Sequence, residues 1–219
     1  MGRHALRGLG AVLLLAACGR RPVAPLPTPN APPRSIGPVG VNREPPADGL
    51  GHRPTYLAPR DPTIADDDLD ALWARQLMVP VEGLTRRTVS NDFQAKRGDR
   101  LHGALDLLAP RYTPVLAADD AVIGRLTTGA IGGIVIYARD LTDRFVYYYA
   151  HLQRVQPGLV VGDTVAKGTV IGYVGTTGNA PPDVPHLHFQ VMKRGAGRVW
   201  WDGPPIDPLP FLVFDGVRN

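Results

Sequence analysis

The sequence has almost no cysteine: Cys18 is the single cysteine among 219 residues. An intrachain disulfide is therefore excluded, and so is a metal site built from several thiolates. Long apolar runs are also missing from the N-terminal region, where the mostly apolar stretch 9–17 is far shorter than the ~20 residues that a helix needs to cross a bilayer. No His-Glu-x-x-His pattern is present, so any zinc chemistry would need another arrangement of ligands.

The net charge of the chain is small. The formal net charge is +4, and two of the positive charges, Arg3 and Arg7, lie in a segment that we expect to be removed. That segment has no Asp or Glu, so the mature chain would carry 4 − 2 = +2. A charge this low, without a basic stripe, argues against nucleic-acid binding.

The N-terminus has the pattern of an export signal. Arg3 and Arg7 form a basic start, the short apolar run follows, and small residues precede Cys18. The segment Leu15-Ala16-Ala17-Cys18 resembles the lipobox of bacterial lipoproteins, which implies a signal peptide over 1–17 and a lipid on Cys18. Gly19 rather than Asp follows the cysteine, and in Gram-negative families this implies sorting to the outer membrane, facing the periplasm. The resemblance implies membrane contact through the lipid anchor alone.

Proline is abundant before residue 62 and recurs there without an apolar period. We therefore expect residues 18–62 to form a flexible tether, and we assign His52 within it no role. Residues 63–90 form a connecting segment, in which 66–77 have the pattern of a helix that Asp66 or Asp67 could cap. A short strand over 78–81 would follow, confined to a sheet edge by Pro80.

From residue 91 onward, short β-branched or alternating runs are separated by Gly, Asp and Asn. This texture predicts an all-β domain over 91–219, either a barrel or a sandwich. The expected strands cover residues 101–108, 114–117, 121–126, 134–138, 145–152, 169–174 and 186–192.

Four of the six histidines fall in three of these expected strands. If 101–108 is one continuous strand, His102 and Asp106 share a face, with the small Ala104 between them. By the same alternation His186, His188 and Gln190 share a face of strand 186–192. In strand 145–152 the alternation places Tyr147, Tyr149 and His151 on one face.

Imidazole and carboxylate are the ligands that zinc prefers in proteins, and a catalytic site keeps a further position for water. His102, Asp106 and either His186 or His188 would supply three ligands, and the remaining histidine would lie beside the water with His151. Strand phasing does not decide between His186 and His188.

The sequence resembles the lysostaphin-type, LytM-like zinc endopeptidases of metallopeptidase family 23. The resemblance spans about residues 90–214 and rests on three ordered motifs, which are His102-x-x-x-Asp106, Tyr149-Ala150-His151-Leu152 and Pro185-His186-Leu187-His188-Phe189. It implies that His102, Asp106 and His188 bind Zn²⁺, that His151 and His186 are catalytic, and that the fold is an antiparallel β barrel or sandwich of the duplicated-hybrid-motif type. Two departures stand out: Gly103 directly follows the first histidine, and segment 179–185 is richer in Pro and Asp than the usual link, which puts the substrate preference in doubt.

The resemblance implies a peptidase that hydrolyses peptide bonds in peptidoglycan stems or crosslinks. One alternative is a non-catalytic lipoprotein of the same type that binds the wall and activates other hydrolases, although all five motif positions are present here. A second alternative is a carrier domain of the lipoyl or biotinyl kind, but Lys167 and Lys193 lack the flanking motif. The large aromatics Trp200 and Trp201 have the pattern of a structural closure more than of a sugar-stacking surface.

Overall fold

The computed structural model describes residues 35–36, 55–56, 58–214 and 217–218. The chain divides into units 1–31 and 32–219, and every described residue lies in the second unit. The predicted signal peptide, Cys18 and most of the predicted tether therefore lie outside the described residues, and the predicted domain boundaries stay predictions. Among the described residues, no helix has the length and apolar character needed to span a membrane.

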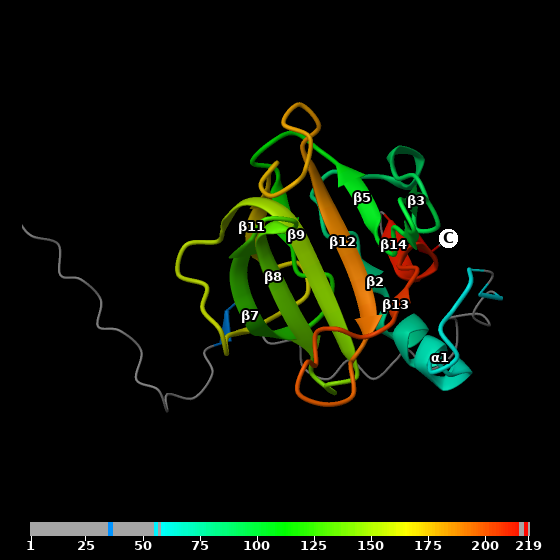
Figure 1. The fold of residues 1–219 in the computed structure, drawn as a ribbon. Helices are drawn as coiled ribbons and strands as arrows, with labels where there is room; N and C mark the ends of the chain where they lie inside the picture. The colour runs from blue at the N-terminus through cyan, green and yellow to red at the C-terminus, as the bar shows by residue number, and fades with distance from the viewer. Residues whose placement is uncertain (1–34, 37–54, 57, 215–216, 219) are drawn as a thin grey trace, which may run out of the picture. The chain divides into compact units, whose positions relative to one another are not determined.

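A ten-stranded sheet dominates the described part of the chain (Figure 1), which confirms the all-β prediction. Its longest strands are antiparallel neighbours in the order β12–β9–β8–β7. The strands of this sheet are β1 (Ser35–Ile36), β5 (Leu105–Leu108), β6 (Pro114–Leu116), β7 (Ala121–Gly129), β8 (Gly133–Asp140), β9 (Phe145–Val155), β10 (Thr164–Val165), β11 (Val170–Val174), β12 (His186–Lys193) and β13 (Pro205–Ile206).

Strand β12 is the centre of the half of the sheet that matters for function. It pairs with β9 along one edge and with β5 and β13 along the other, always antiparallel. Strand β9 pairs with β12 through its first part and with β11 through its last part, while β8 lies along its other edge. Three strands that are distant in the sequence, β5, β12 and β9, are therefore direct neighbours in space.

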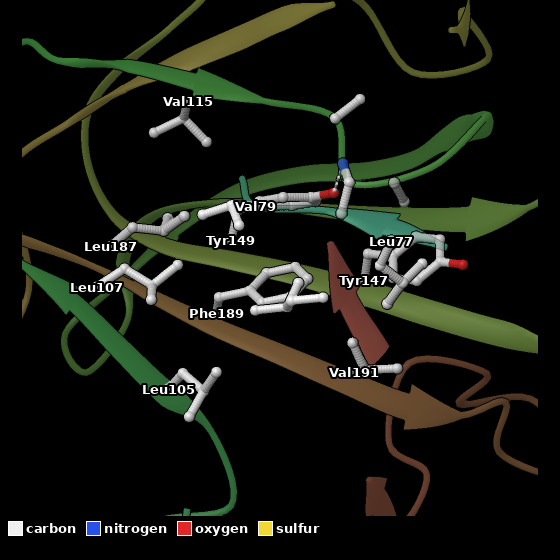
Figure 2. Close-up of a cluster of buried hydrophobic side chains, with 14 of the residues drawn as sticks. Leu77, Val79, Leu105, Leu107, Val115, Tyr147, Tyr149, Leu187, Phe189 and Val191 are labelled. Atoms are coloured by element: carbon white, nitrogen blue, oxygen red, sulfur yellow. Dashed lines mark hydrogen bonds between the residues drawn. The ribbon is translucent and has the colours of Figure 1, made fainter. Parts of the chain in front are cut away.

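The two faces of these strands differ because side chains alternate along a strand. One face is the core, where Figure 2 shows side chains of β5, β9 and β12 packed together with Leu77, Val79 and Val115. Each of these core residues is at most 6% exposed: Leu77, Val79, Leu105, Leu107, Val115, Tyr147, Tyr149, Leu187, Phe189 and Val191. The opposite face carries Asp106, Tyr148, His188 and their neighbours.

The helix and the smaller sheets lie around this core. Helix α1 (Asp66–Arg75) ends earlier than expected because Gln76 adopts a left-handed conformation with φ 50°. Its N-cap residue is Ala65, so the prediction that Asp66 or Asp67 caps the helix is wrong; instead the Asp68 side chain accepts a hydrogen bond from the Ala65 amide at 2.8 Å. The remaining elements are β2 (Leu77–Met78), β14 (Leu212–Phe214) and β15 (Val217–Arg218) in one sheet, the hairpin β3 (Lys96–Arg97) and β4 (Arg100–Leu101), and the 3₁₀ turns η1 (Arg86–Thr88) and η2 (Leu209–Phe211).

The expected continuous strand over 101–108 is broken in the structure. Gly103 has φ 70°, a left-handed conformation, so the chain turns between β4 and β5 instead of staying extended. Leu101 is 47% exposed, whereas the expected alternation placed it on the same face as the fully buried Leu105. The alternation argument for His102 and Asp106 is therefore wrong, and the turn is what brings the two side chains together.

Candidate active site

A groove of about 960 Å³ lies over the face of the β5–β12–β9–β8 sheet that is opposite the core. Its floor comes from every second residue of these strands, because the residues between them point into the core. Its walls come from the β3–β4 hairpin and from the loops around Ile131, Pro181 and Trp201. The floor residues are Asp106, Leu108, Tyr137, Tyr148, Ala150, His186, His188, Gln190 and Met192.

Three side chains meet at one point of the groove floor. His102 Nε2 lies 3.1 Å from Asp106 Oδ1 and 3.0 Å from His188 Nδ1, and His188 Nδ1 lies 3.0 Å from the same Asp106 oxygen. These three residues form a group that could hold a metal ion. The register explains the meeting, since His188 and Asp106 are direct partners across β12 and β5.

The hydrogen bonds of this group favour a cation at its centre. His102 Nδ1 lies 3.2 Å from the Asp92 carbonyl oxygen, which can only accept, so Nδ1 is a donor and Nε2 is the nitrogen that would bind a metal. Nε2 faces the Asp106 carboxylate and a nitrogen of the second imidazole, His188. Two imidazole nitrogens and one carboxylate oxygen fit zinc well, and a backbone partner on the other ring nitrogen is usual for a zinc-bound histidine.

The local fold holds His102 and Asp106 in place through backbone contacts. The His102 amide donates to the Ala95 carbonyl at 2.8 Å, and Gln190 Nε2 donates to the Gly103 carbonyl at 2.9 Å. A Cβ on Gly103 would come within 3.3 Å of the Pro205 ring, so a side chain here would crowd Pro205 in addition to straining the positive φ. The glycine that departs from the usual family position thus shapes the loop between the two residues.

The electrostatic field of the group favours positive charge. Burial lowers the pKa of His102, but hydrogen bonds to Asp106 and Asp92 outweigh it and raise the pKa to about 9. Burial raises the pKa of Asp106, but the hydrogen bonds from His102 and His188 outweigh it and hold the pKa far below the usual range. The same carboxylates that favour a proton on His102 would also favour a metal cation between the ligands.

His151 and His186 lie beside this group, with their ring centroids 4.9 Å apart. His151 Nδ1 lies 2.8 Å from the Thr177 carbonyl oxygen, and His186 Nδ1 lies 2.8 Å from the Val184 carbonyl oxygen. Each Nδ1 is therefore the donor, and each Nε2 keeps its lone pair. Burial lowers the pKa of His151, which keeps this ring neutral near pH 7.

A β-bulge brings His151 to the groove. The β8–β9 register shifts by one residue between the pairs Ile134–Leu152 and Ile136–Tyr149, and His151 has φ 58°. Ala150 and His151 therefore both line the groove. Left-handed backbone at a non-glycine residue is uncommon and is often found at functional sites.

The bulge also separates His151 from Tyr147 and Tyr149, which the alternation placed on the same face as His151. Both are fully buried in the core, where the Tyr147 hydroxyl donates to Asp119 at 2.8 Å and the Tyr149 hydroxyl accepts from the Ala118 amide at 3.0 Å. Tyr148 lines the groove instead, 6.0 Å from the His188 ring. The alternation failed here because nothing in the sequence of β9 marks the extra residue.

Other residues of the groove were not singled out from the sequence. Arg97 contacts the second oxygen of Asp106 at 2.9 Å, and Asp92 Oδ1 accepts from the Asp106 amide at 3.3 Å. Both residues lie outside the three sequence motifs, and no pattern in the sequence predicts their contacts with Asp106. Trp201 lines the groove, and its ring centroid lies 4.4 Å from the guanidinium carbon of Arg125. The ring centroid of Trp200 lies 5.2 Å from the guanidinium carbon of Arg139. The two tryptophans therefore pack on the sheet, as the sequence predicts, and one of them also faces the groove.

The predicted carrier lysines have structural partners. Lys167 Nζ donates to the Gln76 carbonyl at 3.0 Å and also contacts the Arg75 carbonyl. Lys193 Nζ donates to Asp68 at 2.8 Å. Neither lysine stands free on a hairpin, which argues against the carrier-domain alternative.

Comparison with known proteins gives a family match over the site. The family model described as Peptidase family M23 matches residues 100–208, which include all five predicted site residues. The L-Ala--D-Glu endopeptidase of Bacillus subtilis is 33% identical over 131 residues, covering 58% of this chain and 39% of that protein. The peptidoglycan DD-endopeptidase ShyC of Vibrio cholerae is 32% identical over 115 residues, covering 50% of this chain and 25% of that protein.

Among solved structures, the catalytic domain of lysostaphin from Staphylococcus simulans is 30% identical, with a TM-score of 0.44, covering 51% of this chain and 78% of that chain. The match to the two endopeptidases spans less than half of their length.

Proposed function

Because residues 100–208 place this chain in peptidase family M23, we propose that it is a zinc metalloendopeptidase that hydrolyses peptide bonds in peptidoglycan. The observation that carries the proposal is the convergence of three donor atoms, from His102, Asp106 and His188, within 3.1 Å of one another beside two further histidines. In this proposal those three residues hold Zn²⁺, and His151 and His186 are the catalytic pair.

The ligand chemistry supports zinc. His102, Asp106 and His188 would hold the zinc, which would supply a Lewis acid and would lower the pKa of a bound water toward ~7. Asp92 and Arg97 would position these ligands. Asp92 contacts His102 Nδ1 and the Asp106 amide, and Arg97 contacts Oδ2 of Asp106.

His151 and His186 supply the proton transfers. Their Nδ1 atoms donate to the backbone, so their Nε2 lone pairs are free to accept the proton of an attacking water. Once protonated, the same nitrogens can donate to the developing oxyanion and to the leaving amine. The lowered pKa of His151 suits a general base near neutral pH.

The proposed substrate follows from the relatives. Their names include an L-Ala--D-Glu endopeptidase and a peptidoglycan DD-endopeptidase. We place the protein in the cell envelope, held by a lipid on Cys18 at the periplasmic face of a Gram-negative outer membrane. Radiolabelled fatty acid should label the wild-type chain and not Cys18→Ala, and an unlabelled wild-type chain would refute the anchor.

Digestion of purified peptidoglycan tests the proposed activity. The zinc-loaded chain should release fragments with new amino termini, identified by mass, and His151→Ala should lose about 10²–10⁴-fold in rate while it keeps one zinc per chain. A folded protein that binds no zinc and releases nothing would instead support the non-catalytic, hydrolase-activating alternative. A zinc-loaded wild type with no activity on any wall would refute the proposed function.

A further inference from the structure

The β3–β4 hairpin brings two arginines to one wall of the groove. Arg97 and Arg100 are direct partners across the hairpin, on either side of the loop Gly98–Asp99, and both line the groove. Like charges directly opposite each other in an antiparallel pair repel. A two-stranded sheet has little other stabilisation, so this arrangement needs negative charge close by.

Arg97 already has that charge. Its guanidinium lies 2.9 Å from Asp106 Oδ2 and 3.9 Å from Asp92 Oδ2. This contact occupies the outer oxygen of Asp106 and leaves Oδ1 facing the two histidines. Arg97 is thus engaged with the residues that meet at the groove floor.

Arg100 has no such partner among residues 58–214, where its exposed side chain makes no hydrogen bond or ion pair with the described chain. The carboxylates at this end of the groove, Asp92 and Asp106, are engaged with His102, His188 and Arg97. Asp202, the third lining carboxylate, follows Trp201, which contacts Tyr137 of β8. Strand β8 is separated from β5 by β12 and β9, and no hydrogen bond or ion pair joins Asp202 to Arg100 among the described residues.

We propose that Arg100, with Arg97 beside it, binds a carboxylate of the peptide substrate and so makes the enzyme select acidic stem peptides over uncharged crossbridges. The inference rests on the proposed function and assigns the substrate class of the same site. Guanidinium is planar and binds a carboxylate through two parallel hydrogen bonds, which an amide in the same place cannot match. The substrate carboxylate supplies the negative charge that Arg100 lacks among the described residues.

Binding of matched peptides tests the inference separately from hydrolysis. Two peptides of identical sequence contain D-glutamate, one with free carboxylates and one with those groups converted to carboxamides. Their dissociation constants are measured by calorimetry on the full chain carrying His151→Ala, loaded with zinc, so that no turnover interferes. The acidic peptide should bind about tenfold more tightly or better, and this preference should shrink as salt is added.

Substitution of Arg100 locates the preference. With Arg100→Gln the acidic peptide should bind no better than the amide, whereas Arg100→Lys should keep part of the preference. Arg87→Gln, an exposed arginine outside the groove, is the matched control and should keep all of it. Zinc content and thermal unfolding of each variant verify that it is folded.

The outcomes separate the two claims. Equal affinity for the two peptides, including no measurable binding of either, overturns the inference, as does a preference that survives Arg100→Gln. If the preference is present but the wild-type chain cleaves no peptidoglycan, the carboxylate site stands and the proposed function fails. If the wild type cleaves both peptides equally well and binds them equally well, the proposed function stands and the carboxylate site fails.

Discussion

Asp92 illustrates how much of the site depends on a residue that is not itself one of the three converging donors. Its carbonyl accepts from His102 Nδ1 at 3.2 Å, and its carboxylate accepts from the Asp106 amide at 3.3 Å. The residue therefore fixes the ring orientation of one predicted ligand and the backbone position of another. Such outer contacts set metal affinity because they hold the ligand atoms in place before the metal arrives.

The Asp92 carboxylate also lies 3.4 Å from His102 Nδ1. We therefore expect Asp92→Ala, which removes the carboxylate and keeps the backbone carbonyl, to weaken zinc binding by about 10–100-fold while the fold is kept. Competition with a zinc-chelating dye measures the affinity, and circular dichroism follows the fold. Asp99→Ala, in the turn of the β3–β4 hairpin, removes an exposed carboxylate nearby and should leave the affinity unchanged. An Asp92→Ala protein with wild-type zinc affinity would show that the Asp92 carboxylate does not position the ligands.

Asp68 performs a structural task and does not line the groove. It is 3% exposed and accepts hydrogen bonds from the Ala65 amide, Arg144 Nε and Lys193 Nζ, each at 2.8 Å. These contacts join helix α1 to β12 and to the β8–β9 turn. Burial raises the pKa of Asp68, but its hydrogen bonds outweigh this effect, and the pKa lies below the usual 3.8.

A pKa lowered by folding gives a definite pH dependence. The stabilisation by Asp68 is fully present above pH ~4 and is lost as pH falls through the lower pKa of the folded state. Asp68→Asn should therefore lower the free energy of unfolding by about 2–3 kcal/mol at pH 7, and the gap to wild type should narrow below pH ~4. Urea unfolding at both pH values measures this, with the exposed Glu82→Gln as a control; a gap that is constant with pH contradicts the prediction.

At the scale of elements, strand β7 shows how a glycine sets the position of a groove wall. A Cβ on Gly124 would lie 2.4 Å from Trp200 Cη2 and 2.7 Å from Trp200 Cζ2. Trp200 also packs against its neighbour Trp201, with ring centroids 5.4 Å apart, and Trp201 lines the groove. Because Gly124 has no side chain, the Trp200 ring can pack directly against β7.

We expect Gly124→Ala to destabilise the protein by about 1–3 kcal/mol, since the Trp200 ring must move. The emission of the tryptophan pair should shift, and the Michaelis constant should rise because Trp201 moves with its neighbour. Gly129→Ala is a matched control on the same strand, since a Cβ there meets nothing within 4 Å. Equal melting temperatures for the two variants would show that the tryptophan loop does not depend on Gly124.

The success of prediction from the sequence differs from strand to strand for a physical reason. Strand β12 is regular, and its alternation correctly placed His186, His188 and Gln190 in the groove. Strands β5 and β9 are interrupted at Gly103 and His151, both with positive φ. At His151 the interruption depends on partners that are distant in the sequence, among them the Gly132 carbonyl, which accepts from its amide at 2.8 Å, and the Thr177 carbonyl. Local alternation cannot contain such information, whereas the family resemblance named the five positions without needing it.

At the scale of the whole molecule, the sheet order brings the site residues together. His102 and Asp106 come from the start of the domain, His151 from its middle, and His186 and His188 from its end, yet β5, β12 and β9 are adjacent strands. The group therefore exists only when the long-range pairing of the sheet is complete. A metal that binds this group binds the folded chain and not the unfolded chain, so metal binding and global stability are linked.

This linkage predicts the effect of removing zinc. At a free zinc concentration one hundred times the dissociation constant, binding stabilises the folded state by about 2.7 kcal/mol. For a domain of this size that corresponds to a melting temperature higher by about 5–10 °C. Treatment with a chelator should lower the melting temperature by this amount and abolish hydrolysis. Added zinc should restore both, whereas magnesium should restore neither because it prefers oxygen ligands.

The His188→Ala variant should melt at the same temperature with and without the chelator, since it lacks the ligand that joins β12 to β5. A wild-type chain whose melting temperature does not respond to the chelator would contradict the assignment of His102, Asp106 and His188 as a zinc site.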